Sequence, residues 1–200
     1  MMTTDQQALP TSESVANWGG RVTETVQPWY AVRLFTLRLR EVADWFAQAG
    51  MAYFVPMEYR EVVHADGGVG RVLSPVVRNL IFIAKDRPET EVKALIATAP
   101  FRLSVLRKGR EDIAYYEIPH AQMREFQTMC NPAIEMKRYV TADEARVKSG
   151  QPVTVTHGPL RGLTGRLVRA SKKYYLLKEV PGMAVMIKVS RWCCHPLQQK

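Results

Sequence analysis

Apolar residues recur at helical spacing in three segments of the sequence. The first stripe has four members at positions i, i+3, i+4 and i+7, which are Leu39, Val42, Ala43 and Phe46. This spacing predicts an amphipathic helix with Thr36 as its N-cap and Gly50 at its end. Similar stripes predict a second helix that opens near Pro88 and a third that opens at Pro119, since proline suits the first helical turn.

Shorter runs rich in aromatic and β-branched residues predict strands between these helices. They cover 29–34, 52–55 and 79–85, and the last is a central strand that is apolar on both faces. Residues 59–63 and 71–73 predict the two arms of a hairpin around a glycine-rich tip. Helices and strands are mixed without regular βαβ repetition, so the sequence predicts an α+β fold with an antiparallel sheet.

Helical spacing disappears after residue 150, and short strands follow one another instead. The predicted strands are 153–156, 166–170, 174–180 and 184–189, with turn residues between them. This succession predicts a small closed β-barrel, since closure leaves no unpaired strand edge. The patterns divide the chain into a flexible leader (1–28), a mixed domain (29–131), a linker (132–150) and a barrel domain (151–200).

Composition excludes several classes of protein. Of the 200 residues, 46% are hydrophobic and 24% are charged, a balance that is typical of globular chains and not of disordered ones. No apolar run approaches the roughly 18 residues of a membrane helix, and no signal-peptide pattern is visible. Three cysteines, two of them adjacent, cannot form a disulfide framework, so we expect a cytoplasmic protein without membrane partners.

The net charge of +9 is concentrated at one end of the chain. Residues 151–200 hold nine basic residues and one acidic residue, Glu179, whereas residues 29–150 hold 18 basic and 15 acidic ones. Such a basic block attracts polyanions, nucleic acid first, although a basic surface also serves solubility alone. Strand alternation turns either Tyr174 or Tyr175 inward. The cations on and between these strands are Arg161, Arg166, Arg169, Lys172, Lys173, Lys178, Lys188 and Arg191.

No motif in the sequence predicts catalysis. Nucleophile-elbow, zincin and phosphate-loop patterns are absent, and the glycine-rich stretch 67–70 lacks the lysine and the helix of a phosphate cradle. Cys193, Cys194 and His195 are neighbours in sequence, and adjacent residues rarely close on one tetrahedral metal ion. We therefore expect no enzyme activity, no cofactor and no metal site.

One glycine pattern carries more specific information. After Val153 and Val155, three glycines follow at spacings of four and three before the next strand, namely Gly158, Gly162 and Gly165. Glycines at these places permit positive φ in a tight loop between two strands. The segment resembles the KOW motif of NusG-like transcription factors, and a glycine-bearing hairpin of an unrelated β-domain is the alternative.

The N-terminal part resembles the same family. Residues 29–32, the following helix, 54–57 and 75–83 are similar to successive landmarks of the NusG N-terminal (NGN) domain. An NGN domain, a linker and a KOW barrel in this order account for residues 29 to about 197. The sequence looks closest to specialised paralogues of the RfaH and UpxY types. The resemblance implies an NGN-type α/β sandwich joined to an SH3-like barrel.

The resemblance also implies a function. It indicates a transcription elongation or antitermination regulator that binds RNA polymerase and suppresses pausing or termination on long operons such as those for polysaccharides. The clamp helices of the polymerase would contact an apolar patch at Val77, Leu80 and Phe82, although the first aromatic, the proline and the tyrosine that the family often has there are replaced. The alternative is that these residues are core.

Nucleic acid would contact the same domain on another surface. In the family this surface faces the non-template DNA of the transcription bubble, where basic side chains hold phosphates. The cations that match it are Arg38, Arg40, Arg71 and Arg78. Ordinary solvated charges are the alternative for each of them.

The partner of the barrel is left open by the resemblance. Related barrels bind a ribosomal protein or a termination factor, and basic strands with aromatic residues also suit RNA. A translation-linked protein that binds RNA or ribosomes through a KOW barrel is therefore the alternative function. That hypothesis predicts a steep salt dependence of RNA binding.

Overall fold

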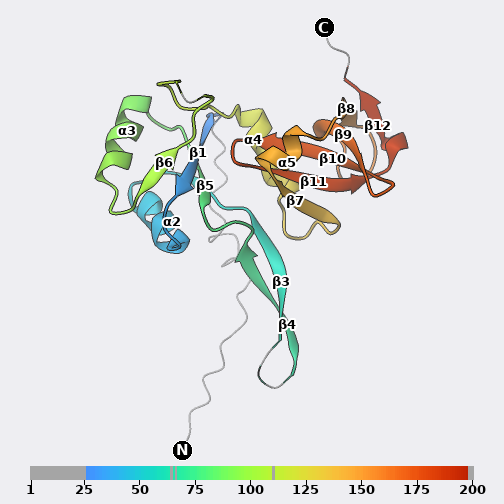
Figure 1. Cartoon of the computed structure of the whole chain (residues 1–200), viewed down its shortest axis with the longest axis horizontal. Helices are drawn as coiled ribbons and strands as arrows, with labels where there is room; N and C mark the ends of the chain where they lie inside the picture. Colours follow the sequence, from blue (N-terminus) through green and yellow to red (C-terminus); the bar gives the residue numbers. More distant parts are fainter. Residues whose placement is uncertain (1–25, 64, 66, 110, 198–200) are drawn as a thin grey trace, which may run out of the picture.

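The computed structural model describes residues 26–197 except 64, 66 and 110, so most of the predicted leader lies outside the described residues. The described chain forms two units side by side, and a long hairpin projects from the first (Figure 1). We call residues 26–131 the N-terminal unit and residues 132–197 the C-terminal unit.

The N-terminal unit is built on a four-stranded antiparallel sheet with the order β2-β5-β1-β6. Its strands are β1 (Trp29–Leu34), β2 (Tyr53–Phe54), β5 (Leu80–Ala84) and β6 (Leu103–Val105). All five residues of β5 are buried, which confirms the prediction of a central strand that is apolar on both faces. Such a strand needs a covering layer on each side of the sheet.

Three helices of the N-terminal unit are α2 (Leu39–Gln48), α3 (Glu89–Thr98) and α4 (His120–Met129). All four apolar residues of the first predicted stripe are buried on α2, which confirms the spacing argument. The predicted N-cap is wrong, because Arg38 holds that position and Thr36 Oγ1 accepts a hydrogen bond from the Arg38 N–H at 3.2 Å. Gly50 follows the helix with φ of 74°, a conformation that glycine adopts without strain.

The two faces of the N-terminal sheet belong to different hydrophobic cores. Side chains that alternate along β1 and β5 point to opposite faces of the sheet. Tyr30, Val32, Ile81 and Ile83 pack with α2 and α3 on one face. The other face packs with α4, and its core continues into the C-terminal unit. The two units therefore share one hydrophobic core, which contains Trp29, Ala31, Leu80, Phe82 and Phe126 from the first unit and Val153, Leu176 and Val185 from the second.

The projecting hairpin consists of β3 (Met57–Val63) and β4 (Val69–Pro75). Its register runs from Met57 opposite Pro75 to Val63 opposite Val69, which confirms the predicted hairpin and extends both arms. The two strands form a sheet of their own, and most of their residues are exposed. Figure 1 shows the hairpin pointing away from both units.

The C-terminal unit is a six-stranded antiparallel sheet with the order β12-β8-β9-β10-β11-β7. Four strands match the predicted ones, and β7 and β12 were not predicted. No pairing between described residues joins β7 to β12, so the closed barrel is not confirmed, while the mixed α+β fold with antiparallel sheets is. The strands are β7 (Lys137–Thr141), β8 (Gln151–Val155), β9 (Thr164–Ala170), β10 (Lys173–Val180), β11 (Met183–Val189) and β12 (Cys194–Pro196), with a 3-10 turn at Arg191–Cys193.

The segment expected to be a linker, 132–150, contains regular structure. Strand β7 pairs with β11, and α5 (Ala142–Arg146) follows directly. Thr141 and Glu144 form a capping box, in which Thr141 Oγ1 accepts from the Glu144 N–H at 3.2 Å and Glu144 Oε2 accepts from the Thr141 N–H at 2.9 Å. The helical turn expected at 141–144 is present, but it is part of the C-terminal unit.

Candidate functional site

The structure requires glycine at all three positions of the motif, two in the loop between β8 and β9 and one at the start of β9. Gly158 and Gly162 have φ of 83° and 89°, in the left-handed region that residues with a Cβ rarely adopt. At Gly165 the reason is space, because a Cβ there would lie 2.6 Å from a backbone carbonyl oxygen of β10. Val153 and Val155 are 1% and 2% exposed and anchor the strand before the loop in the core.

The residues predicted to contact RNA polymerase lie against the shared core. Leu80 and Phe82 are 4% and 0% exposed, and Val77 is partly buried beside them. A Cβ on Gly182, in the turn between β10 and β11, would lie 3.0 Å from Leu80 Cδ2, so this turn covers Leu80. In this arrangement Leu80 and Phe82 present no surface to another protein.

Polar contacts join the two units at the same place. Glu125 on α4 accepts a hydrogen bond from Thr164 Oγ1 at 2.7 Å and pairs with Lys178 Nζ. Gln122 Nε2 donates to the carbonyl oxygen of Glu179 at 2.7 Å. We call this end of the C-terminal sheet, around 178–182, its inner end, and the opposite end of β10, around 173–174, its outer end.

The four arginines predicted to face DNA are exposed. Arg38 forms a solvent-exposed ion pair with Glu41 at 3.5 Å, and Arg40 lies two residues further along the chain on α2. Arg71 lies on β4 of the hairpin, and Arg78 lies just before β5. No hydrogen bond or ion pair between described residues joins any two of the four, so the structure does not bring them into direct contact.

The hairpin also presents apolar side chains to solvent. The register distributes these side chains over both faces of the hairpin, and exposed apolar surface on a projecting element suits contacts with a partner. The sequence predicted the hairpin but not its exposed apolar surface. The β-branched residues in both arms were the only sign of that surface in the sequence. The apolar residues with at least 40% exposure are Tyr59, Val62, Val63, Val69 and Val72.

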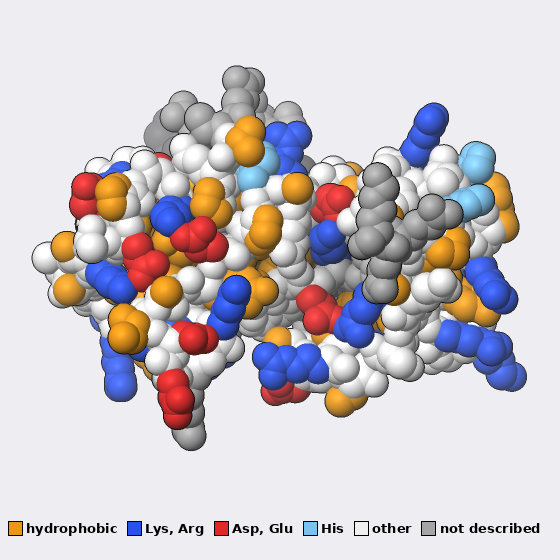
Figure 2. All heavy atoms as spheres, turned by 90° about the horizontal axis from the view of Figure 1, so that it is seen from above, with side chains coloured by type: hydrophobic (Ala, Val, Ile, Leu, Met, Phe, Trp, Pro, Cys, Tyr) orange, Lys and Arg blue, Asp and Glu red, His pale blue; other side chains and the backbone are white. Residues whose placement is uncertain are grey.

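The eight cations of the basic block fall into two groups. Lys178 and Arg166 are engaged at the inner end, where Arg166 donates to the carbonyl oxygens of Ala145 and Lys148 at 2.8 and 2.7 Å and pairs with Glu179. Figure 2 shows basic side chains at the right-hand end of the molecule, on the side of the C-terminal unit, without acidic ones among them. The six that are exposed and form no ion pair with a described residue are Arg161, Arg169, Lys172, Lys173, Lys188 and Arg191.

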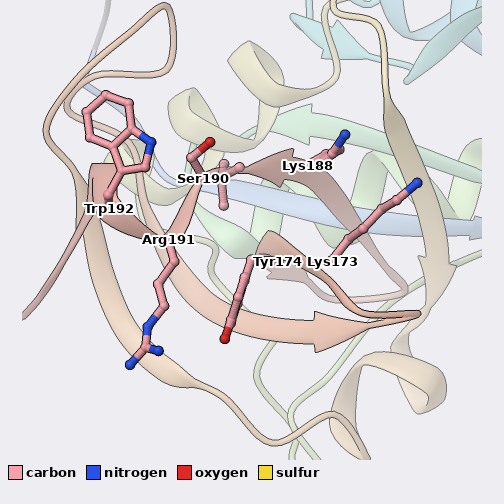
Figure 3. Close-up of a pocket in the computed structure, with 7 residues that line it drawn as sticks. Lys173, Tyr174, Lys188, Ser190, Arg191 and Trp192 are labelled. Atoms are coloured by element: carbon pink, nitrogen blue, oxygen red, sulfur yellow. The ribbon is translucent and has the colours of Figure 1, made fainter.

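Three of these unpaired cations line an open groove of about 670 Å³ at the outer end. Tyr174 lines the groove, whereas Tyr175 packs against the core formed with α5, which confirms that strand alternation separates the two tyrosines. Trp192 was not predicted from the sequence as a binding residue. A tryptophan within a strongly basic segment was the feature that could have indicated it. The lining side chains shown in Figure 3 include Lys173, Tyr174, Lys188, Ser190, Arg191 and Trp192.

The cysteines have the character of structural thiols. Burial raises the pKa of Cys130 to about 12, so this thiol stays protonated at neutral pH and is a poor nucleophile. Burial also raises the pKa of Cys194.

Within the described ranges, no three His, Cys, Asp or Glu side chains gather to hold a metal ion. Nor is any described helix long and apolar enough to cross a membrane.

Comparison with known proteins finds no matching family model and no matching curated protein. The function is therefore inferred from the residues of this chain, from their arrangement and from the resemblance of their motifs.

Proposed function

We propose that this chain is a transcription elongation or antitermination regulator that binds RNA polymerase through residues 29–131. It suppresses pausing or termination on a small set of long operons, such as those for polysaccharide synthesis, and it works in the cytoplasm. The observation that carries the proposal is the succession of an antiparallel α+β unit and a strand-rich unit whose first loop is a KOW-like glycine turn. In this proposal residues 151–200 are the KOW domain, although no pairing between described residues closes the C-terminal sheet into a barrel.

The proposed activity is a binding free energy and involves no covalent step. A factor that binds the elongating polymerase more tightly than the paused one shifts the equilibrium toward elongation by that difference in affinity. A difference of about 1.4 kcal/mol corresponds to a tenfold change in the ratio of the two states.

The burial of Leu80 and Phe82 adds a condition to this function. Leu80 contacts the clamp helices only after the C-terminal sheet leaves the face of β5, because the turn at Gly182 covers it, whereas Phe82 also packs against Phe54 and Phe126 of its own unit. Polymerase binding through this patch therefore competes with the contacts of Glu125 and Gln122 at the inner end. Val77 is partly exposed and is the member of the patch that a partner reaches first.

The exposed arginines supply the second half of the proposed contact. Arg40 on α2, Arg71 and Arg78 are exposed and would hold phosphates of the non-template strand, and Arg38 at the N-cap of α2 would exchange its exposed ion pair with Glu41 for such a contact.

The direct test is capture of bacterial core RNA polymerase by the full chain at low salt, followed by a pausing assay with purified polymerase. We expect a stable complex and shorter pauses. Val77→Asp should weaken capture by about tenfold, since a charge inside an apolar contact is costly, whereas Val147→Asp should not, because Val147 is 83% exposed on the other unit. Failure to recover any complex at low salt contradicts the proposal.

The basic groove favours one rival function, that of a translation-linked RNA-binding protein. Such a protein sediments with ribosomes without polymerase and loses RNA affinity steeply as salt rises. Sedimentation with ribosomes together with unchanged pausing would replace the first proposal by this one.

A further inference from the structure

The groove at the outer end of the C-terminal sheet is formed by the start of β10, the end of β11 and the 3-10 turn that follows. Lys173 and Tyr174 come from β10, Lys188 from β11, and Arg191 and Trp192 from the turn. The strands that build its walls are held in register, since Tyr174 lies opposite Val189 on one side and opposite Arg169 on the other. The groove is therefore built on rigid elements and remains open while the inner end packs against α4.

Two aromatic side chains border this groove. The Trp192 side chain is 72% exposed although tryptophan is a large apolar residue, and the ring of His157 lies beside it at 5.7 Å between ring centroids. The Tyr174 ring has two guanidinium groups over it, those of Arg169 and Arg191, at 5.9 and 5.8 Å from its centroid. In Figure 3, Trp192 and Tyr174 lie on opposite sides of the chain at Ser190–Arg191, so the rings flank the turn.

The charges around the groove are of one sign. Lys173, Lys188 and Arg191 are exposed and form no ion pair with a described residue. The only acidic residue in 151–200 is Glu179, which lies at the inner end and pairs with Arg166. Nothing within the described C-terminal unit neutralises the outer end.

Cations alone would bind any polyanion. The exposed aromatic side chain reduces the number of ligand classes that fit the groove. A single-stranded nucleic acid alternates a negative phosphate with a flat base, and base stacking on exposed aromatic side chains is worth about 1–3 kcal/mol per base. A duplex hides its base faces, so it does not use Trp192 as a platform. An acidic protein pairs with lysines and arginines but gains little from an exposed indole.

We propose that the groove bordered by Tyr174 and Trp192 binds single-stranded nucleic acid, with a base stacked on the exposed Trp192 ring and a phosphate paired with Arg191, which lies over the Tyr174 ring. RNA and DNA share this chemistry, and the experiment below separates them. The inference does not rest on polymerase binding, because the residues proposed to contact polymerase lie on the other unit.

The test measures fluorescence anisotropy of a labelled oligouridylate of about ten nucleotides, a length within the usual site sizes of such grooves. The full chain is titrated with this RNA, with the matching oligodeoxythymidylate and with a duplex of equal length. We expect both single strands to bind more tightly than the duplex. Tighter binding of the RNA identifies a transcript as the ligand, and tighter binding of the DNA identifies an unwound strand.

The decisive variant removes the exposed ring. Trp192→Ala should weaken binding of the single strand by about tenfold or more, in line with the loss of one stacked base. The matched control is Phe35→Ala, since Phe35 is a 55% exposed aromatic with a guanidinium over its ring on the N-terminal unit. Equal affinities for wild type and Trp192→Ala overturn the proposal.

A second pair of variants tests the phosphate contacts. Arg191→Ala should weaken binding several-fold and lower the slope of log affinity against log salt by about one, as expected when one phosphate contact is lost. Arg124→Ala removes the same charge from an exposed position on α4 and should leave the slope unchanged. Equal effects of the two variants, or equal competition by polyglutamate, would show diffuse attraction of polyanions and overturn the groove as a site.

Discussion

The inner and outer ends of the C-terminal sheet both carry lysine and arginine, but these cations are paired at the inner end and unpaired at the outer end. At the inner end, Lys178 and Arg166 have 12% and 31% exposed side chains and contact a carboxylate or backbone carbonyl oxygens. At the outer end, Lys188 and Arg191 are exposed and have no acidic partner among the described residues. A charge of +8 summed over residues 151–200 hides this difference.

The difference separates structural charges from charges available to a ligand. A partly buried cation whose carboxylate is removed leaves a desolvated charge behind, so paired charges resist substitution. An exposed cation without a partner contributes little to folding and is free to bind a polyanion. Net charge therefore suggests a nucleic-acid partner only after the paired cations are set aside.

The largest effect is expected at the ion pair between the units. Lys178→Met should lower the free energy of unfolding by about 2–3 kcal/mol, because Glu125 is then left partly buried without its cation. Lys188→Met, which makes the same change at the outer end, should alter it by less than about 0.5 kcal/mol. Urea unfolding of both variants measures the two values, and similar losses would erase the distinction between the ends.

A second comparison uses two arginines on the same strand. Arg166→Ala should cost about 2 kcal/mol, because the two charge-assisted hydrogen bonds to the carbonyl oxygens of Ala145 and Lys148 hold the end of α5. Arg169→Ala, three residues further along β9, removes an exposed cation that lies over the Tyr174 ring and forms no ion pair with a described residue. It should cost at most about 0.5 kcal/mol. Thermal unfolding followed by circular dichroism compares them, and a larger loss for Arg169→Ala would reverse the assignment.

Alanine substitutions at two glycines test whether side chains at the inner end are closely packed. Gly182 and Gly158 both have positive φ, of 93° and 83°, so alanine at either position is strained by about 1–2 kcal/mol. At Gly182 the new Cβ also lies 3.0 Å from Leu80 Cδ2, whereas nothing lies within 4 Å at Gly158. Gly182→Ala should therefore be the more destabilising of the two and should loosen the contact between the units. Greater sensitivity of the whole chain to limited proteolysis between residues 131 and 137 reports that loosening.

Local sequence patterns predicted most of the helices and strands. The features that they did not predict depend on contacts between residues far apart in the sequence. The spacing of Leu39, Val42, Ala43 and Phe46 was enough to define the buried face of α2, since that face depends on helical geometry alone. The burial of Leu80 depends on the turn at Gly182, about a hundred residues later in the chain, and no local pattern contains that information.

The segment 132–150 shows the same limit. Its charges and scattered apolar residues predicted a linker, yet Val140 and Ala145 are 7% and 0% exposed because β7 pairs with β11 and α5 packs on β10 and β11. At the candidate site, the cations were found from composition, but only the register of β10 showed that Tyr174 and not Tyr175 borders the groove. The 3-10 turn that exposes Trp192 also has no strong sequence signal.

The smallest predicted effect comes from repulsion at the outer end. Arg169 and Arg191 approach the same tyrosine ring and Lys188 lines the same groove, so their like charges raise the free energy of the folded state at low ionic strength. Lys188→Gln should therefore raise the free energy of unfolding by a few tenths of a kcal/mol in dilute buffer, and the gain should vanish near about 1 M salt, where screening acts within about 3 Å. Urea titrations at the two ionic strengths measure this difference. A loss of more than about 1 kcal/mol in dilute buffer would mean that Lys188 has a structural role like that of Lys178, and the contrast between the two ends would then fail at this residue.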